Sequence, residues 1–223
     1  MTSNISVIIP VPPNPNAALL ERALSSINRQ TITTEVEPLV IQNVTAYAAA
    51  LNKCLVSASG EYVIFHEYTN FWEPDGMERI RSYIEEEHPF VWAVFTSSWN
   101  VDEKGKRIVA ADPVDGLVAE QTTGRMEFQK EIGNTVNSAA TIVRMAALRK
   151  VQDFDGFIFN ERLRFHEDWE LWLRFLKHRG KIVFREGDPV SNWYDNPQGR
   201  HKDPLNFLYK QMVYSRIRGG WYD

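Results

Sequence analysis

Apolar segments of strand length alternate with amphipathic segments of helix length through the N-terminal part of the chain, and this alternation constrains the fold most. The segment 5–9 is almost wholly apolar and is stopped by Pro10, which is typical of a buried parallel strand. Further strands are predicted at 38–41, 62–65 and 92–96, with helices running from Leu20 to near Gln30, from a cap at Thr45 through Leu55 to Gly60, and from Pro74 through Ile84. This order predicts an α/β fold with a mostly parallel central sheet flanked by helices.

Three loops should gather at one edge of this sheet. In such sheets, ligands bind beyond the carboxyl ends of the strands. The loops 10–16, 42–45 and 66–72 each follow a predicted strand, and prolines stiffen the first of them. We therefore expect a ligand site where these loops meet.

The second part of the chain is less regular. A polar stretch at 100–134 contains a predicted hairpin turn at 102–106. Strands are predicted at 140–143 and 181–184, on either side of a helix at 169–178.

The C-terminal part is expected to hold a mobile loop at 187–204 and a helix at 204–218. We interpret the chain as a single domain over residues 1–203 with a helical extension over 204–223.

Composition narrows the range of functions. A formal net charge of −4 over 223 residues argues against broad nonspecific binding of nucleic acid. Cys54 is the only cysteine, which excludes an internal disulfide and a thiolate metal site. No apolar stretch reaches the length of a membrane span and no secretion signal is recognisable, so we expect a cytoplasmic protein.

Two adjacent carboxylates, Glu167 and Asp168, stand at the mouth of the predicted amphipathic helix. Free backbone N–H groups and the helix dipole favour negative charge there. An ionised carboxylate at this place, beside Trp169, could accept a proton from a substrate hydroxyl. The alternative interpretation is that Asp168 only caps the helix.

The order of motifs resembles the family 2 glycosyltransferases, enzymes of the GT-A fold. The resemblance extends over about residues 4–195 and rests on the opening strand with Pro10, the helix 20–31, the segment 49–63, the acidic region 65–75, and the motifs 154–157 and 167–174. It implies a nucleotide-binding N-terminal half and an acceptor-side C-terminal half.

The resemblance also implies a reaction and a site. A sugar would pass with inversion from a nucleotide-sugar donor, a UDP-sugar first, to a hydroxyl of a glycan or other acceptor, in polysaccharide biosynthesis for example. Asp168 would be the general base, assisted by Glu167, and Trp169 and Trp193 would contact the acceptor. The donor would be bound by Pro10, Val11, Gln42, Asn43, Glu67, Thr69, Arg200 and Lys202.

The chain departs from the family pattern in the donor site. Gln42 and Asn43 stand where the family has a paired Asp, and Glu67-Tyr68-Thr69 stands where it has Asp-x-Asp. A divalent ion (Mn or Mg) prefers several hard oxygen ligands, so we expect weak metal binding at Glu67, with His201 as a further candidate ligand.

Cations could replace a metal at the diphosphate. Arg200 and Lys202 could stabilise the departing diphosphate, although the same residues also fit a solvated basic loop. His66, next to Glu67, is expected to point to the opposite side of its strand.

Other functions remain open from the sequence. The replaced Asp positions fit a catalytically silent GT-A-like module that binds a nucleotide, a glycan or a partner. A nucleotidyltransferase or a dinucleotide dehydrogenase fits less well, because no Gly-rich phosphate loop follows the first strand. The basic and aromatic tail could contact a polymeric acceptor, a membrane surface or another subunit, with packing or a homodimer expected first.

Overall fold

The computed structural model describes residues 4–111, 134, 136–152, 156–194, 196–197 and 202–221. Its elements follow in this order: β1 (Ile5–Pro10), α1 (Ala17–Asn28), η1 (Thr33–Glu35), β2 (Val36–Ile41), α2 (Tyr47–Ser57), β3 (Tyr62–Phe65), β4 (Phe71–Trp72), α3 (Gly76–Glu86), β5 (Val91–Phe95), β6 (Ser98–Val101), β7 (Arg107–Ala111), η2 (Ser138–Ala140), β8 (Thr141–Arg144), α6 (Met145–Leu148), α7 (Glu167–Lys177), β9 (Lys181–Phe184), β10 (Ser191–Tyr194) and α8 (Asn206–Arg218).

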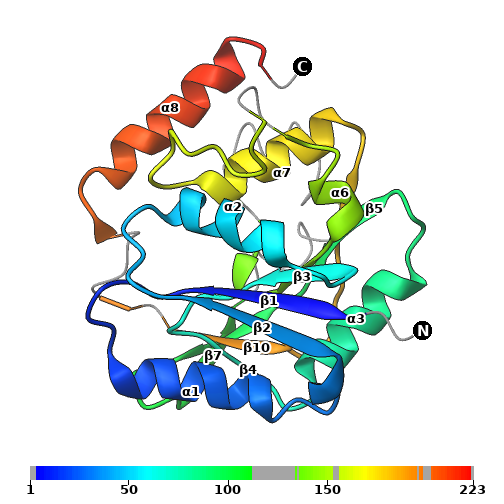
Figure 1. Cartoon of the computed structure of the whole chain (residues 1–223), viewed down its shortest axis with the longest axis vertical. Helices are drawn as coiled ribbons and strands as arrows, with labels where there is room; N and C mark the ends of the chain where they lie inside the picture. The colour runs from blue at the N-terminus through cyan, green and yellow to red at the C-terminus, as the bar shows by residue number, and fades with distance from the viewer. Residues whose placement is uncertain are drawn as a thin grey trace.

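The main sheet has six strands in the order β2-β1-β3-β8-β5-β9 (Figure 1). The pairs β1–β2, β1–β3 and β5–β9 are parallel, whereas β8 runs antiparallel to both of its neighbours, β3 and β5. The predicted mostly parallel sheet flanked by helices is therefore confirmed. The reversal of β8 places its beginning at the edge where β3 and β5 end.

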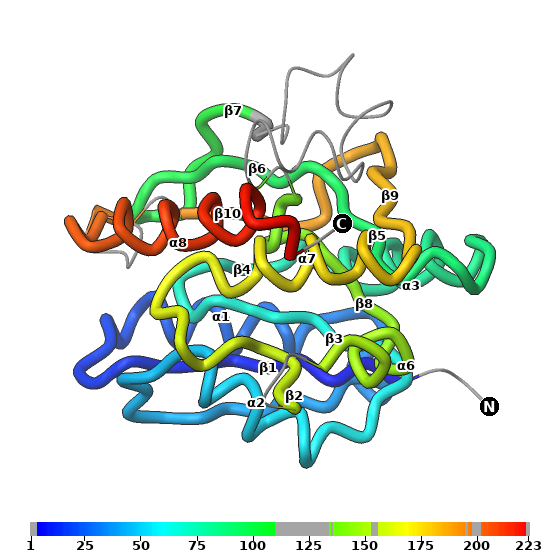
Figure 2. Tube along the Cα trace, turned by 90° about the horizontal axis from the view of Figure 1, so that it is seen from above, coloured from blue at the N-terminus to red at the C-terminus, as the bar shows by residue number. Residues whose placement is uncertain are grey.

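Helices cover both faces of this sheet, as Figures 1 and 2 show. Apolar side chains of α2, α6 and α7 form a core on one face, with Leu51, Leu148 and Trp172 among them. Side chains of α1 and α3, including Ile27 and Ile80, form a core on the other face. Each helix contributes one apolar stripe to its core, which is the pattern expected of a sheet covered on both faces. Cys54 is buried in the first of these cores.

Gly60 is required where the chain leaves α2 and enters β3. Its N–H donates to Ser6 Oγ at 2.8 Å, and Ser6 Oγ in turn donates to Glu37 Oε2 at 2.6 Å. A β-carbon at this position would lie 2.5 Å from the backbone nitrogen of Ser6. Only glycine therefore allows the three strands β1, β2 and β3 to be joined by these hydrogen bonds.

A second sheet has four strands in the order β4-β10-β6-β7. The predicted turn at 102–106 is confirmed: β6 and β7 form a hairpin in which Gly105 has φ of +84° and Lys106 N donates to Asp102 Oδ1 at 2.8 Å. The prediction of a mobile loop at 187–204 is wrong for Ser191–Tyr194, which is strand β10 with Ser191 and Asn192 buried.

Two predicted helix starts are also wrong. The residue before α2 is Ala46, whose side chain cannot cap, so Thr45 is not the N-cap. Helix α3 begins at Gly76 after Asp75, two residues later than Pro74 would indicate. Both helices are stabilised by packing on the sheet rather than by a capping side chain, which is why the local signals misplace their ends.

The predicted C-terminal helix is confirmed as α8, which lies next to α7 (Figures 1 and 2). Val213 is fully buried against Leu163, Trp169 and Leu173. Treating 204–223 as an extension of a domain over 1–203 stays a prediction. Within the described part of the chain, no helix is long and apolar enough to cross a membrane.

Candidate active site

The loops after β1 and β2 are joined by backbone hydrogen bonds at the carboxyl edge of the main sheet. Val11 N donates to Ile41 O at 2.8 Å, and Val44 N donates to Val11 O at 2.9 Å. Pro10 and Val11 are buried, so they form the floor of this edge.

Gln42 and Asn43 lie directly beside this floor, and both are exposed. Asn43 has φ of +59°, a left-handed conformation that Asn tolerates better than most residues. Four of the predicted donor-binding residues are thus brought together: Pro10, Val11, Gln42 and Asn43. The amide side chains can donate and accept hydrogen bonds, which suits a nucleobase without requiring a carboxylate.

The loop after β3 lies on the other side of β1. His66 N donates to Ile8 O at 2.8 Å, and a turn follows in which Asn70 N donates to Glu67 O at 3.0 Å. The turn leaves Glu67 exposed at the sheet edge and buries Thr69. Glu67 therefore faces the expected donor side, whereas Thr69 lies within the protein.

His66 lies in the interior, as the alternation of side chains along a strand indicates. Its Nδ1 accepts a hydrogen bond from Trp72 Nε1 at 3.1 Å, and the side chain is 1% exposed. Burial lowers the pKa of His66 from 6.5 to about 4, so the ring is neutral at pH 7. It is a partner of Trp72 and does not supplement a metal site at Glu67.

Asp168 lies at the same edge of the sheet, next to the beginning of β8. Ser138 Oγ donates to Asp168 Oδ2 at 2.7 Å, and Asn134 Nδ2 donates to the same oxygen at 2.8 Å. Ser138 begins the short helix η2, which leads directly into β8. Because β8 is antiparallel, its beginning lies between the carboxyl ends of β3 and β5, so Asp168 and Glu67 belong to one edge.

Asp168 is not the cap of helix α7. The capping position is held by His166, with φ of +61°, so Glu167 and Asp168 are already in the first turn. Asp168 Oδ1 accepts a hydrogen bond from Trp169 N at 2.8 Å. The carboxylate is therefore held by N–H and O–H donors in the first turn of α7, at the positive end of the helix dipole.

Glu167 and Trp169 point into the protein. Glu167 is 3% exposed, so it can support the arrangement of the site but cannot meet a substrate directly. Trp169 is completely buried and packs edge-on against Tyr214 of α8, with 5.1 Å between the ring centroids. The predicted acceptor contact of Trp169 is therefore replaced by a packing role beneath α8.

The segment after β10 approaches the Glu67 turn. Tyr194 N donates to Asn70 Oδ1 at 3.3 Å. Burial raises the pKa of Tyr68, the charge of Glu67 adds to this rise, and a hydrogen bond with the Asn196 side chain partly opposes it. These two contacts place the end of β10 and Asn196 beside the loop that follows β3.

Of the other predicted site residues, the structure describes Trp193 and Lys202. Trp193 is half-buried in β10, one residue before Tyr194, and Lys202 is exposed. Arg200 and His201 lie outside the described residues, so their roles stay predictions.

The residues at this edge fit a metal ion poorly. Within the described ranges, no group of three or more His, Cys, Asp or Glu side chains could hold a metal. Glu67 supplies one exposed carboxylate, and its neighbours His66 and Thr69 are buried. A divalent ion needs more hard oxygen ligands than this, so the described residues of this edge do not fit a metal site.

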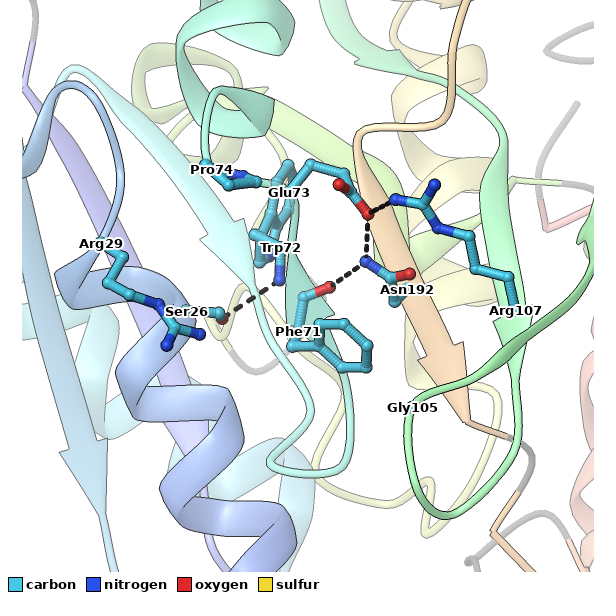
Figure 3. Close-up of a pocket in the computed structure, with 9 residues that line it drawn as sticks. All are labelled: Ser26, Arg29, Phe71, Trp72, Glu73, Pro74, Gly105, Arg107 and Asn192. Carbon is cyan, nitrogen blue, oxygen red and sulfur yellow. Dashed lines mark hydrogen bonds and ion pairs between the residues drawn. The ribbon is translucent and has the colours of Figure 1, made fainter.

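Figure 3 shows a separate cavity of about 270 Å³ among α1, β4, β7 and β10. Glu73 Oε1 accepts hydrogen bonds from Arg107 Nη2 and Asn192 Nδ2, both at 2.7 Å, and Ser26 Oγ accepts one from Trp72 N at 3.1 Å. The cavity does not include any of the sheet-edge residues described above. Its polar groups bind one another, which indicates a structural junction between the second sheet and α1.

Sequence reasoning missed Ser138 and Asn134. Asn134 is the last residue of the polar stretch 100–134, and Ser138 follows it closely. No periodicity there distinguishes one hydroxyl or amide from another. They become recognisable only when the reversal of β8 brings them to Asp168.

Solved structures share this architecture along nearly the whole chain. A structure of S. aureus TarS, residues 1–349, in complex with UDP-GlcNAc matches 95% of this chain and 65% of that one, with a TM-score of 0.66 and 16% identity. The mannosyltransferase PcManGT from Pyrobaculum calidifontis, in complex with GDP-Man and Mn²⁺, matches 98% of this chain and 65% of that one, with a TM-score of 0.66 and 13% identity. The chain has a GT-A glycosyltransferase fold.

A curated sequence relative is also named as a glycosyltransferase. The protein named "Putative glycosyltransferase EpsE", from Bacillus subtilis (strain 168), is 29% identical over 143 residues, which cover 62% of this chain and 46% of EpsE. The chain thus matches less than half of the length of this relative. No family model matches the sequence.

Proposed function

We propose that this chain is an inverting glycosyltransferase that moves a sugar from a nucleotide-sugar donor, a UDP-sugar first, to a hydroxyl of a glycan or other acceptor. The observation that carries the proposal is the position of Asp168, a half-buried carboxylate held at the catalytic edge of a GT-A fold by Ser138 and Asn134. The similarity to EpsE and to structures with bound UDP-GlcNAc and GDP-Man supports it.

The proposed reaction is a single displacement. The acceptor oxygen attacks the anomeric carbon, its proton passes to Asp168, and the bond from that carbon to the diphosphate breaks with its electrons on the diphosphate. Oδ2 of Asp168 already accepts two hydrogen bonds, whereas Oδ1 accepts one. Oδ1 therefore keeps a lone pair for the acceptor proton.

The donor would lie over Pro10 and Val11, with its base near Gln42 and Asn43. Glu67 would contact the sugar, and Lys202, with Arg200, would stabilise charge on the diphosphate. Trp193 is kept as a proposed acceptor contact. A cytoplasmic location and a possible homodimer belong to this proposal as well.

The decisive variant is Asp168→Asn, which keeps the size of the side chain and removes the base. We expect transfer to fall about 10²- to 10⁴-fold while affinity for the donor nucleotide is unchanged. The matched control is Asp188→Asn, because Asp188 is exposed in a different loop. Transfer that survives in Asp168→Asn would contradict the role of this residue.

Calorimetric titration with UDP and GDP, each with and without Mn²⁺, tests the donor site. We expect UDP to bind and Mn²⁺ to strengthen its binding less than about tenfold, because Glu67 is a single carboxylate. Binding that requires Mn²⁺ and disappears in Glu67→Ala would show instead that Glu67 anchors a metal.

A catalytically silent binding module is the second candidate. The observation that favours it is the amide pair Gln42 and Asn43 in the donor site, together with the poor metal ligands at Glu67. Nucleotide binding by the wild type without transfer to any hydroxyl acceptor would support this candidate.

A further inference from the structure

Helix α8 is apolar on two sides, and α7 covers only one of them. On the inner side, Val213 is buried and Tyr209, Tyr214 and Ile217 pack around it. The outer side, the residue before the helix and the turn after it carry large apolar side chains that are 41% to 63% exposed: Leu205, Phe207, Leu208, Met212 and Trp221. Large apolar side chains gathered on an exposed surface often mark a binding site, so this outer face is a candidate for a partner.

Contacts with the protein body hold α8 in place and leave this face outward. His166 Nε2 lies 3.1 Å from Asn206 Oδ1 at the start of α8, and Arg216 Nη1 lies 3.7 Å from Glu170 Oε1 near its end. Beyond the helix, Lys177 Nζ donates to Trp221 O. The exposed apolar residues are thus displayed on a fixed helix.

The charge around this face is opposite to that of the whole chain. The segment 202–221 has four basic residues and the single acidic Asp203, whereas the chain has a net charge of −4. Asp203 forms an ion pair with Arg164 at 3.3 Å and Arg216 forms one with Glu170 at 3.7 Å, so Lys210 and Arg218 are the basic side chains of α8 outside these pairs.

We propose that the outer face of α8 binds the surface of an anionic lipid bilayer. The helix would lie in the plane of the interface, with Phe207, Leu208 and Met212 among the acyl chains and the basic side chains at the headgroups. Trp221 suits the same boundary, because tryptophan prefers the headgroup level.

Charge favours a bilayer over a second copy of this chain. A two-fold pairing through this face would place the basic residues of one copy against the same residues of the other. Like charges facing one another oppose association, whereas an anionic surface attracts them.

The start of α8 lies close to the candidate active site, so membrane binding would bring that site near the bilayer. The first residue of α8, Asn206, contacts His166, which directly precedes Glu167 and Asp168. A bilayer bound to α8 would therefore lie beside the mouth of α7. Membrane binding is measured without turnover, so its outcome is independent of the proposed transferase activity.

The test is co-sedimentation of the full chain with vesicles of phosphatidylcholine, with and without phosphatidylglycerol, at low and high salt. We expect binding only to the anionic vesicles, weakened by salt. Phe207→Ser/Leu208→Ser should weaken it about tenfold or more, and Lys210→Gln/Arg218→Gln about fivefold for each charge removed.

The matched control is Ile108→Ser/Val109→Ser, an exposed apolar pair on β7 that should leave vesicle binding unchanged. Thermal unfolding of each variant checks that it folds as the wild type does. Absence of binding to anionic vesicles, or equal binding by the Phe207→Ser/Leu208→Ser variant, would overturn the proposal. A dimer in sedimentation velocity that dissociates in that variant would assign the face to self-association instead.

Discussion

At the scale of single residues, the site depends on hydrogen bonds between residues far apart in the sequence. Ser138 lies 30 residues before Asp168, and Asn134 lies 34 residues before it. Helical periodicity was enough to place Asp168 at the mouth of α7, because that pattern is local. Its two partners could not be predicted, since only the tertiary fold brings their segment to the same edge.

Ser138→Ala tests this dependence. Removing one hydrogen bond to a charged group costs about 1.5–3 kcal/mol, and here it would loosen the carboxylate that receives the proton. We expect kcat for transfer to fall about tenfold or more with little change in KM for the donor. Ser82→Ala is the control, because the Ser82 hydroxyl donates to the Arg79 carbonyl within its own helix, α3. An unchanged kcat in Ser138→Ala would mean that Asp168 does not need this support.

At the scale of elements, alternation of apolar segments predicted strands β1, β2, β3 and β5 and the helices α1, α2 and α3, but it did not predict β4, which lies in the segment expected to be a loop. The sequence indicated that 140–143 is a strand, yet its antiparallel insertion between β3 and β5 depends on long-range pairing. Strand β10 was missed because its buried residues are polar. Asn192 is stabilised there by a hydrogen bond to Glu73, a partner 119 residues away.

The contact between α7 and its surroundings includes a buried ion pair. Arg174 Nη2 lies 2.9 Å from Glu170 Oε2, and the two side chains are 8% and 4% exposed. Arg174 also donates to the carbonyls of Val151 and Ile158. This guanidinium therefore joins α7 to the chain on either side of residues 153–155.

Arg174→Met should destabilise the protein by about 3–5 kcal/mol, because it removes the nearer of the two arginines paired with the buried Glu170. Glu170→Gln/Arg174→Met should recover a good part of this loss. Urea denaturation of the two single variants and the double variant measures the coupling. Strictly additive losses would show that the pair is not coupled.

At the scale of the whole molecule, stability should depend on pH through His66. Its pKa is about 4 in the folded protein against an ordinary 6.5, so between these values the unfolded chain binds a proton that the folded chain does not. The resulting stabilisation is complete above pH 6.5 and is lost as the pH falls toward 4. At pH 5 the loss is about 2 kcal/mol.

His66→Gln keeps an acceptor for Trp72 and removes the titrating ring. Between pH 7 and pH 5, we expect the wild type to lose about 2 kcal/mol more stability than this variant, as measured by urea denaturation. His88→Gln, at an exposed position, should follow the wild type. Equal losses in all three proteins would assign the acid sensitivity to other groups.

Because Cys54 is buried, the reactivity of its thiol can report how often the core around α2 opens. This single thiol lies in the core between α2 and the sheet, and burial raises its pKa, so a thiol-reactive dye cannot reach a reactive thiolate while α2 stays packed. The rate of labelling then measures how often that helix detaches from the sheet. A ligand that binds over the loops of β1 and β2 should slow this reaction, which gives an assay for donor candidates that needs no acceptor.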